Sequence, residues 1–181
     1  MTNGRQSALS FRMMALLFRL RDLVRPRTRV LAEAGIKPGD RVLDFGCGPG
    51  GYVRPLADIV GPTGEIIALD VNRLAIAAVE NIAFKHRLKN VRTVRSGLKT
   101  GLPDDSVDVA LLYDTFHDLS RPDAVLAEIT RVLKPGGILS FSDHHLADEQ
   151  AVASVTGSGT FRLGARGEHV FTFHVIKETP A

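Results

Sequence analysis

The sequence holds a single cysteine, Cys47, among 181 residues. One thiol excludes an intrachain disulfide framework and suits a reducing compartment, so we expect a cytoplasmic protein. The N-terminal segment lacks the long apolar core and the small-residue cleavage site of a secretory signal. It also lacks a membrane-spanning helix, because Arg12 and Arg19 leave far fewer than about 18 clean apolar residues. Cys47 is either a reactive thiol near a helix start or a small residue facing the core, and we favour the second.

Acidic residues are scarce at the N-terminus. The first 29 residues contain seven arginines and one acid, so the remainder is net negative and the sequence pI of 9.3 reflects an N-terminal arm. The apolar fraction of 44% and the charged fraction of 24% are ordinary for a globular protein. No internal repeat or low-complexity tract occurs. We expect a single domain over residues 1–181, long enough to bury a core.

The arm, residues 1–29, has the pattern of a basic amphipathic helix. Met13, Leu17, Leu20 and Val24 fall on one helical face. Three roles stay open: a lid over the site, which we favour, peripheral contact with an anionic membrane, or contact with nucleic acid. Nucleic acid is an unlikely partner, because no series of aromatic residues accompanies the arginines. A role of the arm in a homodimer also stays open.

The most informative motif follows the first expected strand. Residues 42–52 read Val-Leu-Asp-Phe-Gly-Cys-Gly-Pro-Gly-Gly-Tyr, with a helix expected over residues 52–60. Strand, glycine loop and helix form the layout by which an α/β sheet lets a ligand lie against bare backbone. The helix start offers free N–H groups to an anionic group of that ligand. We therefore expect the functional site at this loop.

A second buried strand, residues 64–71, contains an acid near its end. Asp70 lies about 20 residues after the glycine loop, where such folds place the carboxylate that binds ribose hydroxyls. A carboxylate accepts hydrogen bonds from both vicinal hydroxyls, and it repels a 2′-phosphate. The position therefore indicates a ribose-containing ligand and counts against NADP.

Four segments in one order carry a resemblance to a known family. They are residues 42–50, 67–72, 101–110 and 128–139, the last of which contains Arg-Val-Leu-Lys-Pro-Gly-Gly. In these segments the chain resembles the class I S-adenosylmethionine-dependent methyltransferases, of the small-molecule type that includes the ubiquinone/menaquinone-biosynthesis enzymes. The resemblance spans most of the chain and implies S-adenosyl-L-methionine as the cofactor.

The resemblance also implies which residues bind that cofactor. Asp44 and the glycine loop would hold its methionine end, and Asp70 with Val71 its ribose. Gly97 and Leu98 would lie at the adenine, and Tyr113 would border the cofactor. Family members commonly have an acid where Leu98 stands, so one charge-assisted contact is missing here. The full set of implied cofactor-binding residues is Asp44, Gly46, Gly48, Gly50, Asp70, Val71, Gly97, Leu98 and Tyr113.

Strands and helices alternate along the chain, and a period of two near the end predicts a terminal hairpin. We predict an α/β fold: a Rossmann-like, seven-stranded, mostly parallel sheet with a C-terminal antiparallel hairpin and helices on both faces. Five strands are expected near residues 41–45, 66–70, 91–95, 107–113 and 137–143, and the hairpin over residues 160–164 and 169–176 around a turn at 165–168.

Candidates for chemistry follow the fourth and fifth strands. His117 matches a position where small-molecule methyltransferases often carry histidine, and it is either a general base or a residue that caps or packs. The triplet Asp143-His144-His145 suggests a metal site, but adjacent histidines at a strand end should point in opposite directions. We therefore expect no metal.

The sequence favours methyl transfer to a small-molecule acceptor by in-line displacement, which needs alignment and exclusion of water more than an acid or base. An RNA or protein methyltransferase and a non-catalytic module with this fold remain alternatives. Residues 112–115 lack the motifs common in RNA-modifying enzymes, and Leu98 is the feature that favours the non-catalytic module. A nicotinamide oxidoreductase is a distant third.

Overall fold

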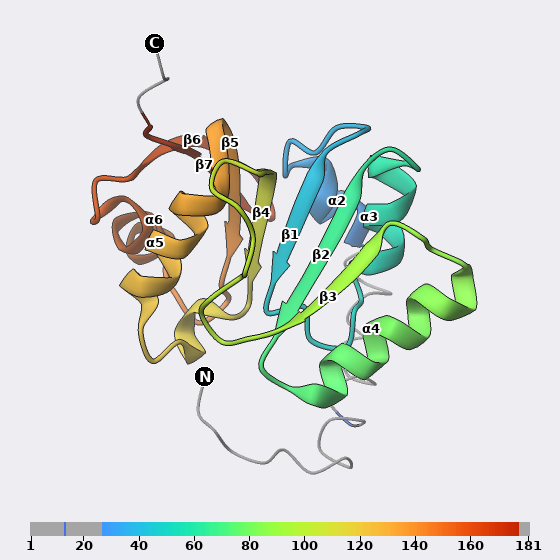
Figure 1. Ribbon diagram of the computed structural model, residues 1–181. Coiled ribbons are helices and arrows are strands. Elements are labelled where there is room, and N and C mark those ends of the chain that lie inside the picture. The colour runs from blue at the N-terminus through green and yellow to red at the C-terminus, as the bar shows by residue number, and fades with distance from the viewer. Residues whose placement is uncertain (1–12, 14–26, 178–181) are drawn as a thin grey trace.

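One mixed sheet organises the molecule, with helices on both of its faces (Figure 1). The computed structural model describes Met13 and residues 27–177. The predicted amphipathic helix and its role as a lid fall almost entirely outside these residues. The seven strands are β1 (Arg41–Phe45), β2 (Glu65–Asp70), β3 (Val91–Arg95), β4 (Val107–Tyr113), β5 (Leu133–Ser142), β6 (Phe161–Arg166) and β7 (Phe171–Val175). The helices are α2 (Arg27–Ala32), α3 (Val53–Val60), α4 (Arg73–His86), the short 3-10 helix η1 (Phe116–Asp118), α5 (Pro122–Val132) and α6 (Asp148–Thr156).

The strand order is β3-β2-β1-β4-β5-β7-β6, and the first five strands of this order run parallel. Strand β7 lies antiparallel to both β5 and β6. The predicted fold class, including the terminal hairpin, is therefore confirmed. Because parallel strands end at a common edge, the loops after β1, β2, β4 and β5 meet at the lower edge of the sheet in Figure 1.

Side chains of β1 alternate between two apolar layers, as the period of a strand requires. Leu43 and Phe45 pack with residues of α5 and α6, whereas Val42 packs with residues of α2 and α3. Both layers are buried, which explains why this strand is apolar at nearly every position instead of at every second one. The helices therefore hold β1, and the loop that follows it, from both faces.

Two predicted boundaries are wrong. Strand β5 begins at Leu133, directly after α5, and not near residue 137. The Lys-Pro-Gly-Gly run forms an irregularity in the pairing of β4 with β5, where Lys134 Nζ lies 2.6 Å from Asp108 Oδ1. The hairpin turn lies at residues 167–170 instead of 165–168, because Ala165 and Arg166 remain paired with β7. Turn-forming residues therefore lie inside β5 and β6, where they shift the register locally without ending the strand.

Candidate functional site

The glycine loop after β1 is fixed to the end of β2. The amides of Gly46 and Cys47 donate to the carbonyl oxygen of Leu69 at 2.8 and 3.0 Å. Gly46 has φ 84°, and a Cβ there would collide with the side chain of Thr115. Gly48 has φ 50° and faces open space, so its backbone is accessible to a ligand. Glycine is therefore needed at 46 by packing and at 48 by backbone conformation.

The Cys47 thiol lies in a small buried cluster with Val53, Ala68 and Val79. Cys47 is 5% exposed. Burial raises the pKa of its thiol above the ordinary value, and the negative charges of Asp44 and Asp70 raise it further. Because a thiol with a raised pKa is a poor nucleophile at neutral pH, Cys47 is a packing residue and not a reactive thiol.

Asp70 connects the loop to the end of β2. Its Oδ2 accepts a hydrogen bond from the Gly48 amide at 3.0 Å, and its Oδ1 accepts one from the Asn72 amide at 2.8 Å. Burial raises the pKa of Asp70, and the hydrogen bonds from the backbone amides of Asn72, Gly48 and Val71 oppose that rise. Each carboxylate oxygen can accept more than one hydrogen bond, so both can also receive ribose hydroxyls.

Asp44, at the end of β1, is 3% exposed. Its Oδ2 is buried and has no hydrogen-bond partner within the part of the chain that the structure describes. Burial raises the pKa of Asp44 to about 7, Arg27 lowers it and Asp70 raises it further. A buried, unsatisfied carboxylate oxygen is costly unless a donor reaches it. The site therefore fits a ligand with a cationic donor group, such as the ammonium group of a methionine moiety.

Arg27, at the start of α2, also belongs to this site, and the sequence reasoning missed it. Its guanidinium lies 4.5 Å from the centroid of the Tyr52 ring, a cation–π contact. A Cβ on Gly51 would collide with that guanidinium. The second glycine of the Gly50-Gly51 pair thus leaves room for an arginine. In the sequence Arg27 was only one of seven arginines of the arm, and no spacing rule brings it to the loop.

The adenine end was predicted at the segment after β3. Val71 is 40% exposed at the end of β2, and a Cβ on Gly97 would come within 2.7 Å of Val71 Cγ1. Leu98 is half-buried against the main core cluster, and its amide donates to Ser96 Oγ at 3.3 Å. Val71, Gly97 and Leu98 therefore form an apolar edge beside Asp70, without a carboxylate at position 98.

Tyr113 lies deeper than expected. The residue is 7% exposed, and its hydroxyl shares a 2.7 Å hydrogen bond with Ser140 Oγ. Burial raises its pKa above the ordinary value, and the hydrogen bond with Ser140 opposes that rise. Its ring packs against that of Tyr52 at 5.2 Å between centroids. Tyr113 thus packs beside the glycine loop through its contact with Tyr52, and its hydroxyl is already hydrogen-bonded to Ser140.

His117 forms a dyad with Asp143 across the ends of β4 and β5. The imidazole Nδ1 lies 2.9 Å from both oxygens of Asp143, and the His117 amide donates to Oδ2 at 2.9 Å. Burial alone raises the pKa of Asp143, but these hydrogen bonds and one from the His145 amide outweigh it and hold the pKa below its ordinary value. The ionised Asp143 therefore fixes the imidazole orientation, and Nε2 on the other side of the ring lies 3.7 Å from Oδ2 of Asp118.

A second histidine–aspartate pair joins the same two loops, and here the histidine follows β5 and the aspartate follows β4. His144, after β5, lies with Nδ1 2.8 Å from Oδ1 of Asp114, after β4. The rings of His144 and His145 are 4.0 Å apart, and the rings of His117 and His145 are 3.9 Å apart. The prediction that His144 and His145 point in opposite directions is therefore wrong. Strand β5 ends at Ser142, so the alternation of a strand no longer applies to them.

Only one group of described residues has ligand atoms spaced closely enough to share a metal ion. It consists of Glu33, Glu168 and His169, near the hairpin turn and not at the β4 and β5 loops. Glu33 already accepts hydrogen bonds there from the amides of His169 and Val170. These bonds give Glu33 a structural role in holding the turn.

Residues 36–168 match the model of a family described as a methyltransferase domain. A solved structure of an S-adenosylmethionine-dependent methyltransferase from Aquifex aeolicus is similar over 81% of this chain and 87% of that one, with a TM-score of 0.70 and 31% identity. The structure of the [4+2]-cyclase SpnF is similar over 76% of this chain and 58% of that one, with a TM-score of 0.65 and 25% identity.

Curated relatives match over a shorter region. The ubiquinone/menaquinone biosynthesis C-methyltransferase UbiE of Ectopseudomonas mendocina is 35% identical over 114 residues, which is 60% of this chain and 44% of that protein. The UbiE protein of Burkholderia cenocepacia is 31% identical over 115 residues, 62% of this chain and 47% of that protein. The chain thus spans about half the length of the curated relatives it matches.

Proposed function

The chain belongs to the S-adenosylmethionine-dependent methyltransferases, and on this premise we propose that it transfers the methyl group of that cofactor to a small-molecule acceptor by in-line displacement. The cofactor supplies a methyl group on a sulfonium, which is already activated for transfer. The protein has to bind it, align the acceptor and exclude water. The observation that carries the proposal is the buried, unsatisfied Oδ2 of Asp44 at the start of a loop in which the backbone of Gly48 faces open space.

In this proposal charged residues hold the methionine end. Asp44 accepts the ammonium group, and the backbone of Gly46, Gly48 and Gly50 lies against the chain that leads to the sulfur. Arg27, whose guanidinium lies beside Gly51 and Tyr52, pairs with the carboxylate of the cofactor. A carboxylate in water-poor surroundings needs such a partner, and guanidinium offers two parallel donors to it.

The nucleoside end lies over the end of β2. Asp70 accepts both ribose hydroxyls while it continues to hold Gly48 and Asn72. Val71, Gly97 and Leu98 would supply the apolar surface for the adenine, with Gly97 leaving room for the Val71 side chain. Tyr113 contributes through its ring, by holding Tyr52 beside the loop. The absent acid at position 98 weakens adenine recognition without changing which cofactor fits.

The His117–Asp143 dyad serves the acceptor. When the acceptor loses a proton during methyl transfer, His117 Nε2 takes it, and the ionised Asp143 stabilises the imidazolium. His117 would then be the catalytic residue and Asp143 its positioning residue. No metal takes part in this proposal.

Support for a small-molecule acceptor comes from the relatives that are more than 30% identical, which are named for C-methylation in ubiquinone and menaquinone biosynthesis. A solved structure described as a putative rRNA-methylase is 20% identical to this chain and supports the fold alone. The cyclase SpnF shares the fold, so a chain without methyl transfer remains the alternative.

Three further predictions from the sequence stay predictions: a lid formed by residues 1–29, contact of that arm with a membrane or with a second copy in a homodimer, and a cytoplasmic location. No helix of the described residues is long and apolar enough to cross a bilayer. Deletion of residues 1–25 tests the lid: cofactor binding should persist while turnover falls, and full turnover would contradict it.

Transfer of a labelled methyl group tests the function. The protein would be incubated with methyl-labelled cofactor and, in separate reactions, quinols and phenols, total RNA, or a protein lysate. Labelled small molecules that are absent with the His117→Ala variant support the proposal. Label in RNA or protein alone would replace it with the corresponding alternative.

A further inference from the structure

The turn between α4 and β3 combines exposed cations with an exposed aromatic residue. We call residues 84–92 the α4–β3 corner. Phe84 is 85% exposed, more than any other large hydrophobic residue that the structure describes. The corner contains three exposed basic side chains at the end of α4 and in the turn, those of Lys85, Arg87 and Lys89. Arg92, also exposed, pairs with Ile67 in the sheet and therefore lies on the face opposite α4.

The positive charge of the corner is not compensated. Within residues 27–177 and Met13, none of its four lysines and arginines forms an ion pair or a side-chain hydrogen bond. Residues 73–99 hold seven lysines and arginines and a single acid, Glu80, whereas residues 100–177 hold six against eleven acids. Residues 73–99 therefore carry the same net charge from lysine, arginine, aspartate and glutamate as the N-terminal arm, residues 1–29.

Arg87 is kept in a backbone conformation that other residues adopt more easily. It ends α4 with φ 54°, in the left-handed region, at the position where helices commonly have glycine. Its amide donates to the carbonyl oxygen of Phe84 at 3.1 Å, and the Leu88 amide donates to that of Ala83 at 2.9 Å. A strained residue that keeps a long charged side chain points to a role for that side chain.

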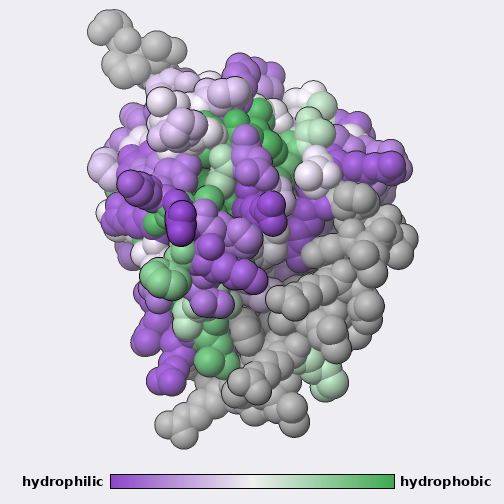
Figure 2. All heavy atoms as spheres, turned by 90° about the vertical axis from the view of Figure 1, so that its right-hand side faces the viewer, coloured by the Kyte–Doolittle hydropathy of each residue, from purple (hydrophilic) through white to green (hydrophobic). Residues whose placement is uncertain are grey.

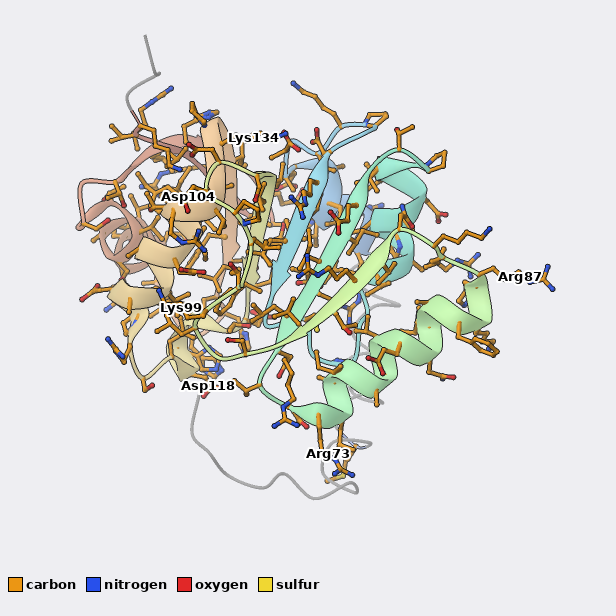
Figure 3. All side chains as sticks on the ribbon, in the orientation of Figure 1. Arg73, Arg87, Lys99, Asp104, Asp118 and Lys134 are labelled. Atoms are coloured by element: carbon orange, nitrogen blue, oxygen red, sulfur yellow. The ribbon has the colours of Figure 1, made fainter. Side chains whose placement is uncertain are left out.

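The corner projects from the molecule. Figure 3 shows Arg73 and Arg87 at opposite ends of α4, with the Arg87 side chain directed away from the sheet. Figure 2 views this side of the molecule, and most of its coloured surface is hydrophilic. The Arg87 end of α4 is therefore open to an approaching surface.

We propose that the α4–β3 corner docks on an anionic lipid surface, with its cations against phosphate headgroups and Phe84 at the boundary with the acyl chains. Exposed cations attract the protein to such a surface, and an aromatic side chain among them supplies apolar contact. A single-stranded nucleic acid is bound by a cationic track with successive aromatic stacking surfaces, which this corner lacks. The inference does not depend on methyl transfer.

Co-sedimentation of the full chain with vesicles tests this. One set of vesicles is phosphatidylcholine alone and the other is phosphatidylcholine mixed with phosphatidylglycerol. We expect binding to the mixed vesicles, weakened by salt, and little to phosphatidylcholine. A corner variant should lose about tenfold or more in affinity; its substitutions are Lys85→Glu, Arg87→Glu and Lys89→Glu.

A matched control reverses three exposed cations elsewhere and so changes the net charge equally: Lys37→Glu, Arg54→Glu and Arg162→Glu. It should retain most of the binding. Two single changes separate docking from folding. Arg87→Gly should weaken binding while leaving the melting temperature equal or higher, because glycine suits its φ. Phe84→Ser should weaken binding while the salt dependence persists.

Three results would overturn the proposal. In the first, the wild type fails to bind anionic vesicles. In the second, the control loses as much affinity as the corner variant, which would indicate a net-charge effect. In the third, the corner variant binds vesicles like the wild type but loses binding to a homopolymer RNA, and the corner would then be a nucleic-acid surface.

Discussion

The Gly48 amide donates a hydrogen bond to Oδ2 of Asp70 over 3.0 Å, across a sequence separation of 22 residues. This bond joins the glycine loop after β1 to the end of β2. The glycine loop, which we assign to the methionine end of the cofactor, and Asp70, which we assign to its ribose, therefore hold each other in place. The same carboxylate also holds the Asn72 amide, which begins α4.

Removal of the Asp70 carboxylate should therefore weaken cofactor binding by at least about tenfold, because hydrogen bonds to a charged group are lost. The change is Asp70→Ala, and the measurement is calorimetric titration with S-adenosylhomocysteine. Asp58→Ala, an exposed acid on α3, is the matched control and should bind normally. Unchanged affinity in the Asp70 variant would show that the ribose lies elsewhere.

Cofactor affinity should depend on pH through Asp44. Its pKa is raised to about 7 by burial, so below that pH the free protein holds a proton that a cationic ligand must displace. Affinity should fall about tenfold for each pH unit below 7. Titrations in buffers of different ionisation enthalpy should detect release of a proton. A flat pH profile would contradict the pairing of Asp44 with the ammonium group.

The Asp44→Asn variant separates binding from stability. Because the pKa of Asp44 is raised in the folded protein, its protonated form stabilises the fold. This stabilisation is complete below pH 3.8, the ordinary pKa, and is lost as pH rises through about 7. Ionised Asp44 therefore destabilises the ligand-free protein above pH 7. The variant should melt at a higher temperature than the wild type in mildly alkaline buffer, yet bind the cofactor more weakly and without the pH dependence.

Loss of the His117 imidazole should lower kcat without changing cofactor affinity. A positioned general base contributes about 10²–10⁴-fold, so His117→Ala should lose that much turnover while its affinity for S-adenosylhomocysteine stays normal. Asp143→Asn should lower kcat and alter the pH–rate profile, because the imidazolium loses its ionised partner. His86→Ala, at the end of α4, is the control histidine. Full activity of His117→Ala would leave the dyad a structural role only.

Acid stability should depend on Glu128, which is 4% exposed. Hydrogen bonds from Arg131 lower its pKa to about 2, burial opposes them, and Thr100 adds further bonds. A lowered carboxyl pKa stabilises the fold fully above pH 4.5, and that stabilisation is lost as pH falls through about 2. Glu128→Gln should cost about 2 kcal/mol at neutral pH, and melting temperatures of the two proteins should converge in acid. A constant difference would contradict this.

The sequence predicted the sheet because its strongest signals are local. The glycine loop, Asp70 at its distance from that loop, and the alternation of Phe171 with Phe173 each follow from strand and turn geometry. Arg27 could not be found this way, since its place over Gly51 and Tyr52 depends on how α2 packs against α3.

The histidines were only half predictable. His117 and Asp143 were both noted, but their pairing spans 26 residues and two loops, and no spacing rule fixes it. The orientation of His144 and His145 was wrong because the exact end of β5 decided it. Tyr113 was placed at the right strand end, whereas its burial and its bond to Ser140 depend on the neighbouring strand.

Parallel calorimetric titrations of the full chain with S-adenosylmethionine, S-adenosylhomocysteine and NAD distinguish a methyltransferase cofactor site from a dinucleotide site. We expect micromolar binding of both sulfur ligands, release of a proton from Asp44 below pH 7, and no binding of NAD. Absence of binding to either sulfur ligand, or binding of NAD at comparable strength, would contradict it.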